Sequence, residues 1–143
     1  MAVTRSASAH WEGSLMEGAG TVHLDSSDLA TFDVTWASRA EDANGRTSPE
    51  ELIAAAHSTC FSMALSHALA QAGTPPTTVD TNAEVSFQAG KGITGIHLTT
   101  RAAVPGLSAE EFTTAAEGAK ANCPVSAALA GTTITLDAQL VEG

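Results

Sequence analysis

The two cysteines of this 143-residue chain lie in unlike settings, and both could do chemistry. Cys60 lies in the middle of an apolar helical run, whereas Cys123 directly precedes Pro124 in an Asn-Cys-Pro-Val-Ser segment. The thiolate is the nucleophile, and burial suppresses it unless a positive charge reaches the sulfur. A cysteine at a helix start instead faces the unpaired N–H groups of the first turn. This arrangement suggests a thiol redox enzyme in which one cysteine attacks and the other resolves.

A nucleophilic Cys60 would need a cation from elsewhere in the fold, because it lies about three turns inside its predicted helix, beyond the helix-dipole field. Arginine is preferred, since it stays charged when desolvated and donates in a fork. Arg39 and Arg46 lie in the loop before the helix, near Glu50, whose carboxylate could orient either one. Glu50 is about 15 Å along the helix axis from Cys60. In a symmetric dimer, Arg39 and Glu50 of the other subunit could reach Cys60 despite this separation along one helix.

The N-terminal third of the chain alternates small or apolar residues with polar ones, which predicts strands. The first two strands should form a hairpin, and a polar, glycine-containing loop should follow the third. The predicted strands cover residues 8–15, 20–24 and 31–36, and the loop covers 38–47.

The following segment predicts a long helix with a clear start. Ser48 is the expected N-cap, Pro49 occupies the first helical position, and Glu51 closes a capping box. The helix should run to about Gln71, because Gly73 supplies a stop. Its residues are apolar nearly all round, so we expect the helix to be buried in the core.

The rest of the chain predicts two strands, two helices and a closing strand. These cover residues 79–88, 93–104, 108–121, 124–131 and 132–141, in that order. The order is typical of an α+β fold with mainly antiparallel sheets around a long central helix, in one domain over residues 1–143. Because one small sheet can hardly cover so apolar a helix, we expect a dimer whose terminal strands are shared or intertwined.

The net charge and the first residues of the chain limit which partners and which cellular location we expect. Six basic residues face 16 acidic ones, a net charge of −10, so nucleic acid and anionic membranes should repel the protein. The first ten residues hold no signal-peptide stretch, and we expect no segment near the roughly 18 apolar residues of a membrane helix. We therefore expect a cytoplasmic protein with small substrates or protein partners. In that reducing compartment the cysteines could serve packing, metal ligation or transient redox chemistry.

The chain resembles the OsmC/Ohr family of peroxidases over nearly its whole length. Two separated cysteine motifs in order make the resemblance specific, and His57 with the Phe-Ser-Met-Ala-Leu-Ser run is similar to the OsmC branch. The segments that carry it are residues 9–13, 48–57, 60–66 and 122–126. The resemblance implies an OsmC-like fold and an intertwined homodimer with two active sites at its interface. It also implies a peroxidatic Cys60, a resolving Cys123, and Arg39 and Glu50 completing each pocket, with Arg46 as the alternative arginine.

The expected activity is that of a thiol-dependent peroxidase acting on organic hydroperoxides, with hydrogen peroxide as a further candidate substrate and without bound cofactor or metal. Attack by Cys60 would give a sulfenic acid, which condenses with Cys123 to a disulfide that an external dithiol reduces. This interpretation predicts a Cys60 pKa well below its ordinary value.

Other interpretations stay open beside this one. A buried helical cysteine is most often a packing residue, and His57 is more typical of a hydrogen-bonded core residue than of a metal ligand. The main alternative is a non-catalytic dimeric protein that binds small apolar ligands. A zinc-dependent hydrolase is a third hypothesis, which elemental analysis of the purified protein would test.

Overall fold

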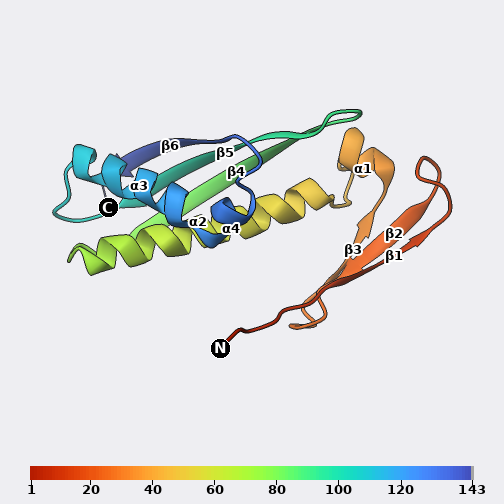
Figure 1. Ribbon diagram of the computed structural model, residues 1–143, viewed down its shortest axis with the longest axis horizontal. Helices are drawn as coiled ribbons and strands as arrows, with labels where there is room; N and C mark the ends of the chain where they lie inside the picture. Colours follow the sequence, from red (N-terminus) through yellow and green to blue (C-terminus); the bar gives the residue numbers. More distant parts are fainter. Residues whose placement is uncertain (143) are drawn as a thin grey trace. The chain divides into compact units, whose positions relative to one another are not determined.

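The structure, a computed structural model, describes residues 1–142. The chain forms two compact units, one over Met1–Leu52 and one that begins at Ile53. Each unit contains one three-stranded sheet (Figure 1). The α+β class expected from the sequence is confirmed, and a single domain over residues 1–143 stays a prediction.

The first unit contains an antiparallel sheet of order β1-β2-β3. Its strands are β1 (Ser8–Glu12), β2 (Ala19–His23) and β3 (Thr31–Val34), which confirms the predicted hairpin and third strand with somewhat shorter bounds. Trp11 on β1 lies opposite Gly20 on β2. A Cβ atom at Gly20 would come within 2.6 Å of the Trp11 ring, so only glycine lets the indole lie across the neighbouring strand.

A short helix, α1 (Trp36–Ala40), follows β3. The expectation of a loop starting at Ser38 is therefore wrong for its first residues. The cause is a local capping box: Thr35 Oγ1 accepts from the Ser38 N–H at 3.1 Å, and Ser38 Oγ accepts from the Thr35 N–H at 3.0 Å. The Ser38 hydroxyl also contacts the Thr47 carbonyl at 2.8 Å, which ties α1 to the chain entering the next helix.

The long helix α2 (Pro49–Gln71) starts and ends where the sequence predicts. At its start, Ser48 Oγ accepts from the Glu51 N–H at 3.1 Å. The Glu51 carboxylate accepts the Thr47 hydroxyl at 2.6 Å, so its side chain supports this start through Thr47.

Only one face of α2 is buried, so the prediction of all-round burial is wrong for the described chain. Beyond Glu50 in the first turn, the buried residues recur every fourth position, as one helix face requires: His57, Phe61, Leu65 and Leu69. Met63, on another face, is 68% exposed. The side of α2 that carries Met63 therefore lies in contact with solvent.

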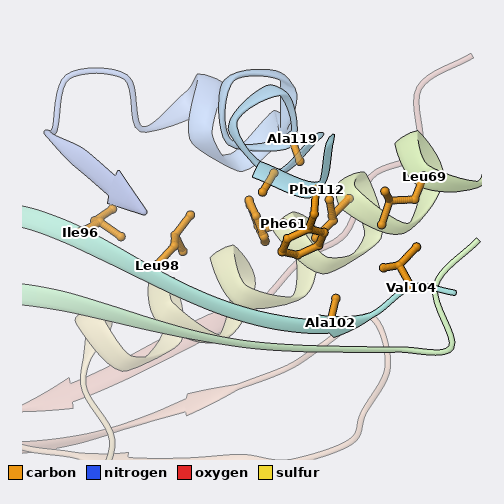
Figure 2. Close-up of a cluster of buried hydrophobic side chains, with 10 residues drawn as sticks. Phe61, Leu69, Ile96, Leu98, Ala102, Val104, Phe112 and Ala119 are labelled. Carbon is orange, nitrogen blue, oxygen red and sulfur yellow. The ribbon is translucent and has the colours of Figure 1, made fainter. Parts of the chain in front are cut away.

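The sequence-based expectation that no segment could cross a membrane is also wrong. By length and composition alone, α2 is long and apolar enough to do so. A buried helix of a protein core has the same length and composition. The stripe of large side chains on α2 packs into the core of the second unit, which is the behaviour of a core helix (Figure 2).

The second unit contains a sheet of order β4-β5-β6 and two further helices. The elements are β4 (Thr78–Gln88), β5 (Gly92–Ala103), α3 (Ala109–Asn122), α4 (Pro124–Ala128) and β6 (Ile134–Val141). β4 and β5 pair antiparallel as predicted, whereas β5 and β6 pair parallel. Parallel neighbours need a crossover, and α3 and α4 form that connection.

The core of the second unit lies between its sheet, α2 and α3. Phe61 of α2 and Phe112 of α3 meet there above Leu98 and Ala102 of β5 (Figure 2). All four side chains are at most 1% exposed. This packing holds α2 and the α3–α4 segment in a defined position, and those two segments carry the cysteines.

Candidate active site

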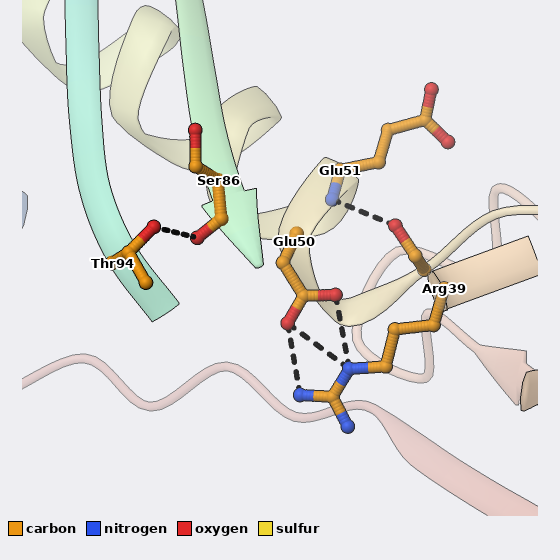
Figure 3. Close-up of polar contacts among 6 residues, drawn as sticks. Arg39, Glu50, Glu51, Ser86 and Thr94 are labelled. Carbon is orange, nitrogen blue, oxygen red and sulfur yellow. Dashed lines mark hydrogen bonds and ion pairs between the residues drawn. The ribbon is translucent and has the colours of Figure 1, made fainter. Parts of the chain in front are cut away.

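Arg39 and Glu50 form an ion pair within the first unit, eleven residues apart in sequence. Arg39 Nη2 donates to Glu50 Oε2 at 2.9 Å, and Nε lies 3.1 Å from both carboxylate oxygens (Figure 3). The Glu50 side chain is 7% exposed and that of Arg39 is 32% exposed. A fork of this kind fixes the direction of the guanidinium, because planar bidentate contacts are geometrically specific.

Of the two arginines that the sequence leaves as alternatives, the structure brings Arg39 to Glu50. Arg46 is exposed, in the turn between α1 and α2, and its backbone N–H donates to the Ala43 carbonyl at 3.0 Å. The capped helix α1 causes the difference, because it places Arg39 in its last turn.

Arg39 also lines an apolar cavity that lies wholly within the first unit. The cavity has a volume of about 410 Å³, and its walls come from all three strands of the sheet, from α1 and from the start of α2. The large apolar side chains around it are those of Trp11, Leu15, Trp36 and Leu52. The first unit therefore combines one oriented cation with a surface suited to a hydrocarbon group.

Both cysteines are free thiols and are neighbours in the second unit, where each affects the proton equilibrium of the other. Cys60 is half-buried on α2. Cys123 is fully buried and forms both the C-cap of α3 and the N-cap of α4. Pro124 explains this break, since it cannot donate within α3 but suits the first position of a new helix.

The surroundings shift the pKa values of the two thiols in opposite directions. Burial raises the pKa of the Cys60 thiol, and its contact with Cys123 raises it further, against partial opposition from the Val125 N–H. Burial also acts to raise the pKa of the Cys123 thiol, but donors from Cys60, Ser126 and Val125 outweigh it and lower that pKa. The surroundings of Cys123 therefore favour its thiolate, whereas those of Cys60 favour the neutral thiol.

This order differs from the expectation of a strongly acidic Cys60. Within the second unit, the groups that shift the Cys60 pKa include no lysine or arginine. Burial without a cation favours the neutral thiol. A low Cys60 pKa would need a positive charge beside the thiol, which the groups named here do not supply.

The Cys123 sulfur makes no cap hydrogen bond to α4. The Val125 and Ser126 N–H groups and the Ser126 hydroxyl nevertheless lower the pKa of its thiol. The influence of N–H groups on this sulfur, which the sequence predicts, is thus present in the pKa direction without a cap hydrogen bond.

His57 is a hydrogen-bonded core residue, as the sequence favours. It is 0% exposed on α2, and its Nε2 lies 2.8 Å from the Ser126 hydroxyl. Burial lowers the pKa of His57 below its ordinary value, which favours the neutral imidazole. The described residues hold no group of three or more histidine, cysteine or acidic side chains that could bind a metal.

Sequence reasoning missed Ser126 as a member of this cluster. Its position three residues after Cys123 is the available signal, since a residue at that spacing faces the N-cap of a helix. Its contact with His57 spans 69 residues and follows only from the packing of α4 on α2.

Comparison with known proteins identifies the family. A family model described as OsmC-like protein matches residues 41–137. The peroxiredoxin OsmC of Escherichia coli (strain K12) is 47% identical over 143 residues, covering 98% of this chain and 99% of that protein. The peroxiredoxin OsmC of Shigella flexneri matches with the same figures.

Solved structures agree in fold. An organic hydroperoxide resistance protein OsmC from Legionella pneumophila has a TM-score of 0.69 at 25% identity, with 96% of each chain covered. An OsmC like protein from Mycoplasma pneumoniae has a TM-score of 0.74 at 16% identity, covering 99% of this chain and 100% of that one, which bears on the fold alone. By the family match and the full-length similarity to peroxiredoxin OsmC, this chain belongs to the OsmC-like family and to its OsmC branch.

Proposed function

We propose that this protein, a cysteine-based peroxidase by its family, reduces organic hydroperoxides with Cys60 and closes the cycle through Cys123. The observation that carries the proposal is the pair of neighbouring free thiols, one half-buried and one fully buried. A peroxide must reach the sulfur that attacks it, so the more accessible Cys60 is the attacking residue. Cys123, whose environment favours the thiolate, is the resolving residue.

The chemistry proceeds in balanced steps. The Cys60 thiolate attacks the terminal peroxide oxygen, so that a sulfur–oxygen bond forms and the oxygen–oxygen bond breaks. The alkoxide takes up a proton and leaves as the alcohol, and Cys60 becomes a sulfenic acid. Cys123 then displaces hydroxide, which takes up a proton and leaves as water, and the resulting disulfide is reduced by an external dithiol. The cycle uses no bound cofactor.

Arg39 supplies the positive charge that this scheme needs, and Glu50 holds it in place. An arginine beside the reacting atoms lowers the pKa of the attacking thiol and stabilises negative charge on the departing oxygen. The buried Glu50 holds the guanidinium in one direction, and the apolar cavity beside Arg39 suits the organic part of a hydroperoxide. We assign Arg39 rather than Arg46 because of the bidentate contact with Glu50.

A homodimer that delivers Arg39 and Glu50 of one copy to Cys60 of the other fits these observations. Large apolar side chains are exposed in both units, among them Trp11, Leu15 and Met63. Exposed apolar surface of this kind is typical of an interaction site. A second copy of the chain is the occupant that we propose, since its Arg39 would also provide the missing cation.

The net charge of the protein and its need for a dithiol reductant indicate its remaining partners and its location. With a net charge of −10, the protein should not bind nucleic acid or anionic membranes. Dithiol reductants maintain a reduced pool in the cytoplasm. We therefore propose a cytoplasmic enzyme with an external dithiol as its second substrate.

The decisive experiment is mass spectrometry after one equivalent of cumene hydroperoxide. The parent protein should gain a Cys60–Cys123 disulfide, and Cys123→Ser should retain a trappable sulfenic acid on Cys60. Cys60→Ser should show neither product. A sulfenic acid that forms on Cys123 in the Cys60→Ser variant would reverse the two roles.

The apolar cavity also favours a second candidate, a non-catalytic dimeric protein that binds small apolar ligands. The same experiment separates the two. A binding protein would leave both thiols reduced after one equivalent of the hydroperoxide, while an apolar ligand without a peroxide group would still bind. Formation of the disulfide within one equivalent excludes this alternative.

A further inference from the structure

The buried histidine of α2 has one satisfied and one unsatisfied ring nitrogen. His57 Nε2 lies 2.8 Å from Ser126 Oγ, whereas Nδ1 is a buried atom without a hydrogen-bond partner among the described residues. Buried N–H groups without a partner are rarer than buried acceptors with spare capacity. The less costly tautomer therefore carries its hydrogen on Nε2 and leaves Nδ1 as the bare acceptor.

This tautomer determines the direction of the Ser126 hydroxyl. If His57 Nε2–H donates to Ser126 Oγ, the serine's own hydrogen is left to donate elsewhere. Cys123 lies three residues earlier, at the N-cap of α4, so Ser126 is the third residue of that helix, a position whose side chain lies beside the cap residue. Its hydroxyl also acts to lower the pKa of the Cys123 thiol. A hydrogen freed on Ser126 Oγ can therefore be turned toward the Cys123 sulfur.

We propose that His57 and Ser126 are positioning residues that aim a hydrogen-bond donor at the Cys123 sulfur and so accelerate disulfide formation with Cys60. The inference rests on the proposed peroxidase function and assigns two further residues to its resolving step. Neither residue touches the peroxide, so the first oxidation of Cys60 should not depend on them.

The resolving step explains why such a donor matters. Cys123 must lose its proton before its sulfur attacks Cys60 and the sulfur–sulfur bond forms. The sulfur–oxygen bond of the sulfenic acid then breaks, and hydroxide with the released proton leaves as water. Cys123 is oxidised and Cys60 is reduced, while Ser126 and His57 emerge unchanged. A fully buried sulfur gains little help from solvent, so a fixed donor must stabilise its charge.

The ionisable groups around this sulfur come mainly from α2. Cys60 contacts Cys123 directly, and His57 reaches it through Ser126. On α3, which ends at Cys123, the last-turn Lys120 pairs with Glu117 at 3.3 Å. The pH profile of the resolving step should therefore report the two thiols and the His57–Ser126 pair.

The test separates the two chemical steps by stopped flow with one equivalent of cumene hydroperoxide across a range of pH. For Ser126→Ala, we expect sulfenic acid formation within about twofold of the parent rate. Disulfide formation should slow about tenfold, and its pH midpoint should rise by about one unit, because a donor to a charged sulfur is lost. An unchanged rate and midpoint for disulfide formation would overturn the proposal.

Matched variants distinguish positioning from packing. Ser126→Thr and Ser126→Val have the same shape and differ in the hydroxyl, so only the threonine should keep the parent's pH midpoint. His57→Gln retains a donor near the Nε2 position and should resolve faster than His57→Leu. Ser62→Ala is the control, because this serine of α2 donates to Thr81 Oγ1 at 2.7 Å. Equal pH midpoints for the threonine and valine variants would contradict the proposal.

A peroxide-free measurement keeps the inference testable if the peroxidase function fails. In a Cys60→Ser background, thiolate absorbance reports Cys123 alone. Adding Ser126→Ala to this background should raise the Cys123 midpoint by about one pH unit. An unchanged midpoint would overturn the inference, whereas absence of any parent disulfide with peroxide would overturn only the peroxidase function.

Discussion

At the scale of single residues, the Arg39–Glu50 pair has a structural role beside the chemical role that we propose for it. The Glu50 side chain is almost fully buried, and a buried carboxylate without a partner is strongly destabilising. The exposed part of Arg39 lines the apolar cavity. A single substitution therefore changes stability and chemistry together, and an experiment has to separate the two.

Replacement of Arg39 should slow the reaction of Cys60 with peroxide far more than replacement of Arg46. Loss of one preorganised donor to a developing negative charge costs about a hundredfold in rate, so we expect this for Arg39→Ala. Arg46→Ala should stay within about twofold, as expected for an exposed loop charge. The measurement is the rate of sulfenic acid formation under excess hydroperoxide. The opposite ranking would move the site arginine to Arg46.

A double variant separates the two roles of this pair. Arg39→Ala with Glu50→Gln removes the unpaired buried charge, so it should recover much of the stability that Arg39→Ala loses. The rate of Cys60 oxidation should stay low, because the guanidinium is still absent. Recovery of the rate together with the stability would show that Arg39 acts only through folding.

The buried His57 should make the protein less stable in mild acid. Its folded-state pKa lies below the ordinary 6.5, so the unfolded chain binds a proton that the folded chain resists. The stabilisation is present above pH 6.5 and is lost as pH falls toward the folded-state value. Urea unfolding from about pH 7.5 to about pH 5 should show this loss in the parent and a smaller one in His57→Gln. If the free energy of unfolding changed equally with pH in the parent and in His57→Gln, the loss of stability would not come from His57. The control on the same helix is His67→Gln.

At the scale of elements, α2 has one buried apolar face and one exposed face that carries Met63. The His57, Phe61, Leu65 and Leu69 face is buried against β5 and α3. The face with Met63 is exposed, although its composition would suit a core. A helix that buries one apolar stripe in its own chain keeps the other available for a second surface.

The α3–α4 segment illustrates how caps place a functional residue. Ser108 and Glu111 form a capping box that defines the start of α3. Pro124 ends α3 and begins α4 at Cys123. Two local signals, 16 residues apart in the printed sequence, thereby fix Cys123 at a helix junction, where backbone N–H groups can face its sulfur.

At the scale of the whole molecule, a second copy of the chain should cover the exposed apolar surface. Sedimentation velocity of the parent should give twice the mass of one chain. Met63→Lys should weaken this association and slow Cys60 oxidation, because the arginine would no longer reach the thiol. Thr113→Lys, at an exposed position of α3, should do neither. A monomeric parent with full peroxidase activity would contradict the shared site.

Much of the local structure could be predicted from the sequence because local groups determine it. Ser48 and Pro49 start α2, Ser108 starts α3, and Pro124 starts α4. Alternating residues predict all six strands, since the strand period is two. The family, and with it the roles implied for the cysteines, also came from motifs in the sequence.

Only the tertiary structure decided which distant groups meet. It joined Arg39 to Glu50 and His57 to Ser126, paired β5 parallel to β6, and buried one face of α2 rather than all of it. It also set the opposite pKa directions of Cys60 and Cys123. Caps and periodicity act over a few residues, whereas desolvation and hydrogen bonding across the fold depend on packing that no local pattern encodes.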